Sequence, residues 1–236
     1  MRSLAINVGA NTNQPGFRGP LFADGTFEYI PIPEEKPTSE PVPTYADLEV
    51  TTDVSEVADV PVHFDPEFPE AGGERYTYGD EHGVKARPIA DLSARDYLLF
   101  YATLSTTAER PEWAPPEWGA FLVGHFRLAR EPVTGEAYAD LPPEDRAVFD
   151  SNAHVKRADF DARVLVLGDP TESRLYDTAV PLSEPSGGTD SNRLVTEHSS
   201  DSGKGPWWRR PLRFDESGTE RLLEAANGAP VIDPDE

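Results

Sequence analysis

Amide, guanidinium and carboxylate side chains gather near the start of the chain. Asn7, Asn11 and Arg18 fall within twelve residues, and Asp24 follows them. An amide offers both a donor and an acceptor to the edge of a base, and an arginine binds phosphate or guanine through two parallel hydrogen bonds. Asp24 can donate or accept a proton. The alternative is that the asparagines serve turns and that Asp24 only forms an Asp-Gly hairpin.

Histidines mark two further segments. His125 follows Gly124 inside an apolar run, where a glycine often indicates the close approach of a ligand. A histidine there can exchange a proton or contact a base, and the alternative is a half-buried histidine satisfied by its neighbours. The second segment contains Asn152, His154 and Arg157, which either share faces of one helix or form a loop at the mouth of the sheet.

The histidines do not follow a metal-binding spacing. His125, His154 and Asp24 are conceivable ligands, but the chain has no His-x-His or HExxH pattern, and the His-Phe-Asp stretch at His63–Asp65 is an equally weak signal. Cysteine is absent, which excludes disulfides, thiolate zinc sites and cysteine nucleophiles. We therefore predict no metal site. The cofactor stays unknown, because Walker A and GxGxxG loops are also missing.

An aromatic and basic segment lies near the C-terminus. The stretch GKGPWWRRPLRF has four basic residues and no acidic one, in a chain of net charge −22. Adjacent tryptophans beside arginines suit stacking on bases and pairing with phosphates. The predicted nucleotide-binding residues in it are Trp207, Trp208, Arg209 and Arg210. The equal alternative is an apolar lid whose arginines contact their own tryptophans through cation–π interactions.

The charge balance bears on the setting of the protein. Acidic residues number 43 against 21 basic ones, and only four of the basic residues are lysine. Such an excess is typical of a halophilic protein, because carboxylates keep a surface hydrated where salt screens charge within about 3 Å at 1 M. The alternative is an ordinary acidic protein that avoids nucleic acid. On the halophilic interpretation, the net charge does not exclude a nucleic-acid partner.

Apolar segments must position these side chains. Runs at residues 97–104, 120–131 and 162–169 predict three buried strands, the first two as an antiparallel pair. Residues 141–157 are the best helix candidate, and residues 218–228 predict a closing amphipathic helix. Irregular loops separate the strands. This favours the α+β class, with a curved, mainly antiparallel sheet, a few short helices and long loops.

The chain length suits one domain, which we expect over residues 1–225, with a frayed acidic tail over residues 226–236. No apolar run approaches the ~18 residues that span a bilayer. The N-terminus also lacks the apolar core of a signal peptide. We therefore expect a cytoplasmic protein without a membrane partner.

The segment from Ile6 to Glu34 resembles a known family. Its sequence, INVGANTNQPGFRGPLFADGTFEYIPIPE, is similar to the N-terminal signature of the nucleotide modification associated domain 3 (Nmad3) proteins. The likeness extends over residues 1–225 and includes the GHF, NAH and GPWWRRPL segments. It implies a role around modified nucleobases in restriction, phage or DNA-modification settings, with a nucleotide or nucleic acid as the partner.

A weaker likeness connects the two strands near residues 95–128 with PUA-like domains of the EVE and YTH type. That resemblance implies a barrel that holds a modified base in an aromatic cage, although Arg95-Asp96 stands where those domains have Gly-Asp. Three functions remain open: an enzyme acting on a base, a non-catalytic reader, and an interaction component of a defence system. The acid–base candidates of the enzyme are Asp24, His125 and His154.

Overall fold

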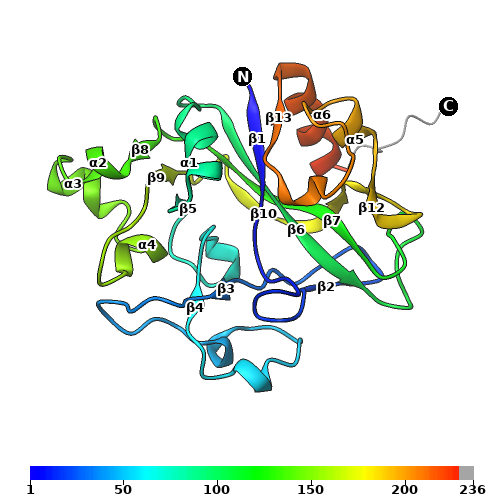
Figure 1. Ribbon diagram of the computed structural model, residues 1–236, viewed down its shortest axis with the longest axis horizontal. Helices are drawn as coiled ribbons and strands as arrows, with labels where there is room; N and C mark the ends of the chain where they lie inside the picture. Colours follow the sequence, from blue (N-terminus) through cyan, green and yellow to red (C-terminus); the bar gives the residue numbers. More distant parts are fainter. Residues whose placement is uncertain (229–236) are drawn as a thin grey trace.

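A six-stranded sheet forms the centre of the computed structural model, which describes residues 1–228 (Figure 1). Five strands lie in the order β10-β7-β6-β1-β13, and β2 pairs with β6 beside them. The bounds are β1 (Ser3–Asn7), β2 (Pro20–Leu21), β6 (Tyr97–Thr106), β7 (Trp118–Arg127), β10 (Arg174–Pro181) and β13 (Leu212–Phe214). The expected tail beyond residue 228 lies outside the described residues.

The predicted strand pair is the longest pairing in the sheet. Strands β6 and β7 are antiparallel, from Tyr97 opposite Arg127 to Ser105 opposite Trp118. Strand β1 runs parallel to β6, and β13 runs antiparallel to β1. The α+β class is therefore confirmed, with parallel pairings inside a mainly antiparallel sheet. No barrel forms from the described residues, because β10 and β13 lie at opposite edges and do not pair with each other.

Three smaller sheets surround the central one. Strand β9 lies within the third predicted strand, residues 162–169, and pairs with β5 and β8. Their bounds are β5 (Thr77–Asp80), β8 (Val133–Thr134) and β9 (Val164–Leu167). The two-stranded sheets are β3 (Ile32–Pro33) with β4 (Val62–His63), and β11 (Ser183–Glu184) with β12 (Gly187–Ser191).

The helices are short, as predicted. They are α1 (Gly83–Ala90), α2 (Gly135–Tyr138), α3 (Pro143–Ala147), α4 (Ala153–Lys156), α5 (Arg193–Thr196) and α6 (Glu216–Ala226). Single 3₁₀ turns are η1 (Tyr45–Asp47), η2 (Ser55–Val57), η3 (Pro69–Ala71) and η4 (Trp207–Arg209). Within residues 1–228, every helix is too short or too polar to span a bilayer.

The single helix predicted over residues 141–157 is wrong. The chain forms α3, turns, and starts again at α4, where Asn152 is the N-cap and its side chain accepts a hydrogen bond from the backbone N–H of His154. An asparagine that bonds its local backbone competes with a continuous helix and favours a new start. This break places His154 at the start of a helix rather than in its middle.

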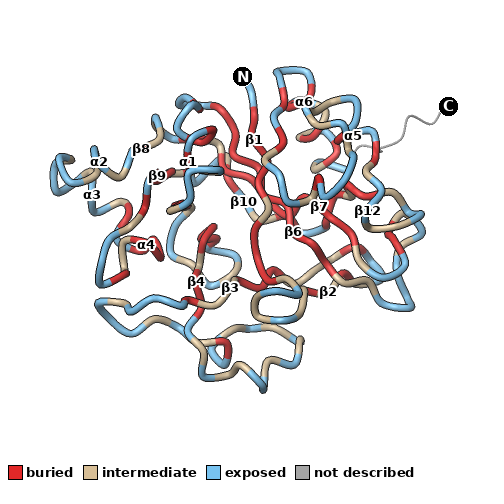
Figure 2. The backbone as a smooth tube through the Cα atoms, viewed as in Figure 1, coloured by how far each residue is buried: buried red, intermediate tan, exposed pale blue. Residues whose placement is uncertain are grey.

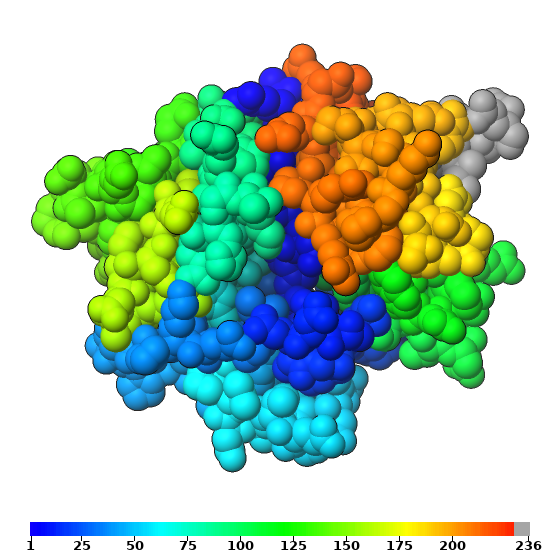
Figure 3. All heavy atoms as spheres, viewed as in Figure 1, coloured from blue at the N-terminus to red at the C-terminus, as the bar shows by residue number. Residues whose placement is uncertain are grey.

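The two faces of the central sheet carry separate apolar cores, because side chains alternate along a strand. On one face, Phe100 and Phe126 pack with Phe68. On the other face, Leu99 and Leu122 belong to a cluster that includes residues of α5 and α6. Figure 2 shows buried backbone along these strands, and Figure 3 shows the N-terminal segment in blue between the teal and orange parts of the chain.

Candidate functional site

A polar pocket of about 190 Å³ lies where the end of β1, the loop after it, β5, α1 and α4 meet. Its polar lining comes from these different elements: Asn7, Asn11, Gln14, His63, Asp65, Asp80, Glu81, Lys85, His154 and Arg157. Gly9 also lines it with a backbone φ of +75°, which favours glycine. Three segments distant in sequence, at residues 63–65, 78–85 and 154–157, therefore bring titratable groups to one place.

Local backbone features hold the centre of the pocket. His63 ends β4, and Asp65 follows it by two residues. The backbone N–H of Gly79 donates to both carboxylate oxygens of Asp65, at 2.8 and 3.0 Å. A Cβ atom on Gly79 would lie 2.6 Å from Cδ2 of His154 and 3.1 Å from Oδ1 of Asn152. Glycine at this strand position thus lets α4 approach β5.

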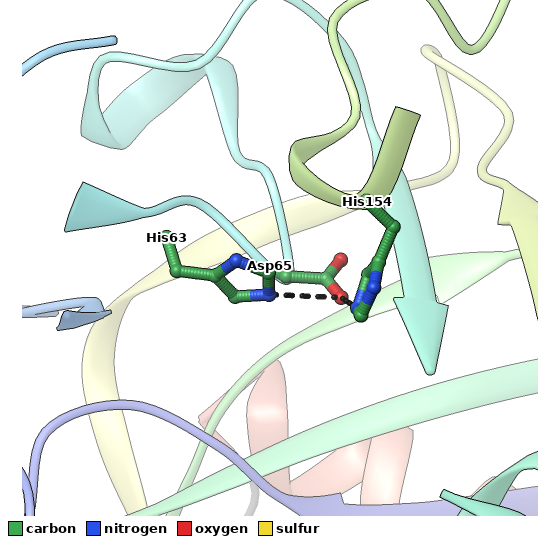
Figure 4. Close-up of side chains that lie close together, drawn as sticks. All are labelled: His63, Asp65 and His154. Atoms are coloured by element: carbon green, nitrogen blue, oxygen red, sulfur yellow. Dashed lines mark ion pairs between the residues drawn. The ribbon is translucent and has the colours of Figure 1, made fainter. Parts of the chain in front are cut away.

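Two of the histidines that line the pocket, His63 and His154, are each held by a carboxylate. Nδ1 of His63 lies 2.5 Å from Oε2 of Glu34, and Nδ1 of His154 lies 2.7 Å from Oδ1 of Asp161. The two Nε2 atoms face the same oxygen, Oδ2 of Asp65, at 3.7 Å for His63 and 3.2 Å for His154 (Figure 4). The rings are perpendicular, with centroids 4.9 Å apart. All three side chains are buried.

Arg157 is enclosed by carboxylates. Its Nη2 lies 3.0 Å from Oε1 of Glu34, and its Nη1 lies 3.1 Å from Oε2 of Glu81 and 2.7 Å from Oδ2 of Asp161. Lys36 pairs with Glu81 and Asp161 as well. The guanidinium of Arg157 is thus occupied by its own network, and its contribution is to hold these carboxylates in place.

The pocket shifts the pKa values of its groups in opposite directions. Burial lowers the pKa of His63, but hydrogen bonds to Asp65 and Glu34 outweigh burial and raise it to about 9. Burial raises the pKa of Glu34, yet hydrogen bonding from His63 lowers it to about 2. Burial lowers the pKa of Lys85 and raises that of Asp80. Titratable groups with opposed shifts in a pocket are typical of sites that transfer protons.

The same groups offer ligand atoms for a cation. One nitrogen each from His63 and His154 and one oxygen of Asp65 lie within 4.8 Å of one another. Glu81, Asp161 and His154 form a second such set within the described chain. Chemically, the pocket can therefore exchange protons, bond the polar edge of a base, or coordinate a metal ion.

Part of the predicted site meets at this pocket. Its lining includes Asn7, Asn11, His154 and Arg157. Asn152 does not line the pocket, but its side-chain amide donates to Oδ1 of the lining residue Asp65 at 3.3 Å. The turn alternative also applies to one of them, because Oδ1 of Asn11 accepts a hydrogen bond from the backbone N–H two residues later. The structure thus joins the N-terminal asparagines to the segment around α4.

His125 lies elsewhere, on the face of the sheet that packs against α6. Its Nδ1 is 2.9 Å from the hydroxyl of Tyr176, and its Nε2 is 2.8 Å from the carbonyl oxygen of Glu172. Because a carbonyl only accepts, Nε2 carries the proton and Nδ1 accepts from the tyrosine. Burial lowers the pKa of His125 to about 4. The structure therefore separates His125 from His154.

Asp24 occupies the predicted Asp-Gly turn, away from the polar pocket. The turn closes through a hydrogen bond from the N–H of Phe22 to the carbonyl of Thr26, at 2.8 Å. The Asp24 carboxylate accepts from the N–H of Thr26 at 3.0 Å and from its hydroxyl at 2.6 Å. It lines a larger, mainly apolar cavity of about 550 Å³ with Trp113 and Val180. That cavity brings together few ionisable side chains.

Arg18 and Trp208 form a third group. The guanidinium of Arg18 lies 4.6 Å from the ring centroid of Trp118, and the rings of Trp118 and Trp208 are 5.4 Å apart. All three side chains are partly exposed. The predicted cation–π alternative concerned the arginines of the GKGPWWRRPLRF segment, so this contact between Arg18 and Trp118 does not test it.

The remaining predicted residues of η4 have different environments. Trp207 is fully buried, and its indole N–H donates to the carbonyl of Thr189 at 2.8 Å, so its ring presents no face for stacking. Arg210 pairs with Asp201 at 2.8 Å. Arg209 is exposed. The adjacent tryptophans therefore point into different surroundings.

Sequence reasoning did not single out the residues that organise the pocket: Glu34, Asp65, Asp80, Lys85 and Asp161. The His-Phe-Asp stretch was the available signal, because alternate residues at the end of a strand lie on one side. The sequence did not distinguish these carboxylates from the rest of the 43 acidic residues.

Comparison with known proteins places this pocket in a family context. The profile described as nucleotide modification associated domain 3 matches residues 2–224. This range includes all of the polar pocket, the turn at Asp24 and the group around Trp208. Comparison of the chain with curated proteins and with solved structures found no match in either set.

Proposed function

Because this chain belongs to the nucleotide modification associated domain 3 family, we propose that its polar pocket takes a nucleobase and takes part in its modification. The observation that carries the proposal is the convergence of groups with opposed pKa shifts, among them His63, Glu34, Asp80 and Lys85. The shifts of Asp80 and Lys85 move their pKa values towards neutral pH, as proton transfer requires, whereas those of His63 and Glu34 are the shifts of an ion pair. Family membership supplies the class of ligand, and the pocket supplies the chemistry.

The size and charge of the pocket favour a base over a phosphate. Its volume of about 190 Å³ is below the roughly 300–1,000 Å³ of pockets for drug-sized ligands. It therefore suits one ring system, with the sugar and phosphate outside. The carboxylates around Arg157 would repel a phosphate, whereas the amides of Asn7 and Asn11 suit the polar edge of a base.

Lys85 is the proton-transfer group that we propose for this site. Its ammonium donates to the carbonyl of Asn7 at 2.9 Å, and Asp80 lines the same pocket. Burial lowers the pKa of Lys85, and the charges of Asp80 and Asp65 oppose that shift. A lysine with a lowered pKa can act as a base near neutral pH.

The test is turnover of modified DNA. DNA containing 5-hydroxymethylcytosine or 5-hydroxymethyluracil is incubated with the protein in molar potassium chloride, digested to nucleosides and measured by mass spectrometry. We expect a change in base composition that Lys85→Gln reduces about 10²–10⁴-fold. Arg87→Gln, an exposed change on the same helix, is the matched control. Equal activity of both variants, or equal loss in both, contradicts the proposed role of Lys85.

A second candidate function is a non-catalytic reader of modified bases. It is supported by Arg18, Trp118 and Trp208, whose partly exposed rings and cation are adjacent. Stacking of a base on an aromatic side chain contributes roughly 1–3 kcal/mol, so Trp208→Ala should weaken DNA binding about tenfold to 100-fold. Phe160→Ala, at an exposed aromatic residue on another segment, is the control. Binding that survives Trp208→Ala contradicts the reader.

A further inference from the structure

We propose that His63, Asp65 and His154 bind one divalent transition-metal ion inside the polar pocket. Imidazole nitrogen and carboxylate oxygen are ordinary ligands of zinc, iron and manganese. The three residues come from the end of β4, the loop after it, and α4, so the set exists only in the folded chain. The sequence gave only a weak sign of it, the His-Phe-Asp stretch at His63–Asp65.

The positions of the ligand atoms fit one ion. Nε2 of His154 and Nε2 of His63 lie 3.2 and 3.7 Å from Oδ2 of Asp65 (Figure 4). Ligand bonds of about 2.0–2.2 Å around a tetrahedral zinc ion place neighbouring ligand atoms about 3.4 Å apart. The side chains in Figure 4 point toward one another, so coordination needs only small adjustments.

The outer contacts fix both imidazoles in the form that binds metal. Glu34 and Asp161 accept hydrogen bonds from Nδ1 of His63 and His154, as carboxylates do behind metal-bound histidines. In the neutral imidazole, that proton position leaves a lone pair on each Nε2 atom. Both Nε2 atoms face Oδ2 of Asp65, so either a proton on each nitrogen or one shared cation can join the three atoms. Asp65 itself is held by the N–H of Gly79.

The charge of the pocket matches a divalent ion. The hydrogen-bonded network around the two imidazoles contains four carboxylates and two fixed cations. Its members are Glu34, Asp65, Glu81 and Asp161, with Lys36 and Arg157. Four negative charges against two positive ones leave two negative charges when the histidines are neutral. Two protons on the imidazoles would balance the same charge, and the experiment distinguishes that case.

Three protein ligands leave coordination positions open, which is the pattern of catalytic rather than structural metal sites. The ion would face the lining that contains Asn7 and Lys85. A ligand atom of a base, or a water molecule, can complete its coordination there. The inference deepens the proposed function, but metal binding can be measured without any nucleotide.

The experiment is calorimetric titration of Zn²⁺ into chelator-treated protein at pH 7.5 in molar potassium chloride. We expect one equivalent per chain. Glu34→Gln, which changes a group behind a ligand, should weaken Zn²⁺ binding by about 10–100-fold. His63→Gln and His154→Gln each remove a ligand and should weaken Zn²⁺ binding by more than that. His125→Gln, which changes a buried histidine outside the pocket, should leave the affinity within about twofold.

A second measurement needs no variant and covers failure of the variants to fold. Wild-type protein loaded with one equivalent of Cu²⁺ should show nitrogen hyperfine coupling from two imidazoles in electron paramagnetic resonance. Absence of stoichiometric Zn²⁺ binding by folded wild type means that protons balance the pocket and overturns the proposal. Equal binding by wild type, His63→Gln and His154→Gln overturns it as well. If Lys85→Gln loses turnover but still binds Zn²⁺, the metal site and the proton-transfer role of Lys85 are independent, so one proposal can fail without the other.

Discussion

The histidine on strand β7 and the histidines of the polar pocket are equally well buried, but their partners differ in charge. His125 bonds a tyrosine hydroxyl and a backbone carbonyl, both neutral. His63 and His154 bond carboxylates through both ring nitrogens. Burial against neutral partners lowers the pKa of His125, whereas carboxylates raise that of His63. Partner charge, rather than burial, thus sets the direction in which folding shifts the pKa of each of these two histidines.

The pocket tolerates buried carboxylates because fixed cations are paired with them. Arg157 compensates three carboxylates, while no fixed cation is needed beside His125. Removal of one member of a buried ionic network leaves the others uncompensated, and that loss is larger than the loss of a surface pair. The following predictions test this contrast, beginning with the largest effect.

Arg157→Met should lower the free energy of unfolding by about 3–5 kcal/mol, because it leaves the buried Glu34 carboxylate without its guanidinium. Urea unfolding in molar salt measures this. Arg130→Met, which removes a half-exposed pair with Asp145, should cost only about 0–1 kcal/mol. The double variant Arg157→Met/Glu34→Gln should recover part of the loss. Equal effects of the two arginine changes would remove the contrast between pocket and surface.

Acid should destabilise the folded protein through His125. The folded pKa of His125 is about 4, below the unfolded value of about 6.5, so the unfolded chain binds more protons between these values. The stability from keeping His125 neutral is present above pH 6.5 and is lost as the pH falls towards 4. The loss amounts to roughly 3 kcal/mol.

The measurement is urea unfolding of wild type and His125→Gln from pH 7 to pH 4. Other carboxylates titrate in this range in both proteins, so the difference between the two curves isolates His125. Wild type should lose more stability than the variant. Parallel curves would mean that folding does not lower the pKa of His125.

Gly79→Ala should have the smallest effect on stability, about 1–3 kcal/mol, because its Cβ would overlap the ring of His154. The new methyl group should also move His154 away from Asp65 and weaken Zn²⁺ binding. Gly187→Ala is the control, since its nearest neighbour would be a carboxylate oxygen of Asp190 at 3.5 Å. Unchanged metal affinity in Gly79→Ala, together with the expected loss of stability, would mean that the methyl group disturbs the packing without moving the ligand atom of His154.

The elements with strong apolar patterns were predictable from the sequence. Strand β9 falls within its predicted range, β6 and β7 overlap theirs with ends shifted by two to four residues, and α6 corresponds to the predicted closing helix. Helix α1 was not, because its segment GVKARPIA begins with glycine and contains Pro88, both poor helix formers. The parallel pairing of β1 with β6 also has no local signal, since it joins residues about ninety positions apart.

The candidate site was only partly predictable for the same reason. Asn7, Asn11, Asn152, His154 and Arg157 are residue types that draw attention, and the fold brings them together. Glu34 and Asp161 become informative only because they contact the ring nitrogens of His63 and His154, and such contacts depend on tertiary structure. His125 shows the converse: its residue type draws attention, and only the fold shows that it is buried between neutral partners outside the polar pocket.

The position of β1 between β6 and β13 has a consequence for how the chain folds during synthesis. Strand β13 is synthesised long after β1, so one side of β1 has no partner until residue 214 has left the ribosome. A nascent or truncated chain that ends before Leu212 exposes that edge to other chains, which is a template for aggregation. C-terminal truncation should therefore damage the N-terminal end of the sheet first, and with it the strand that leads into the pocket.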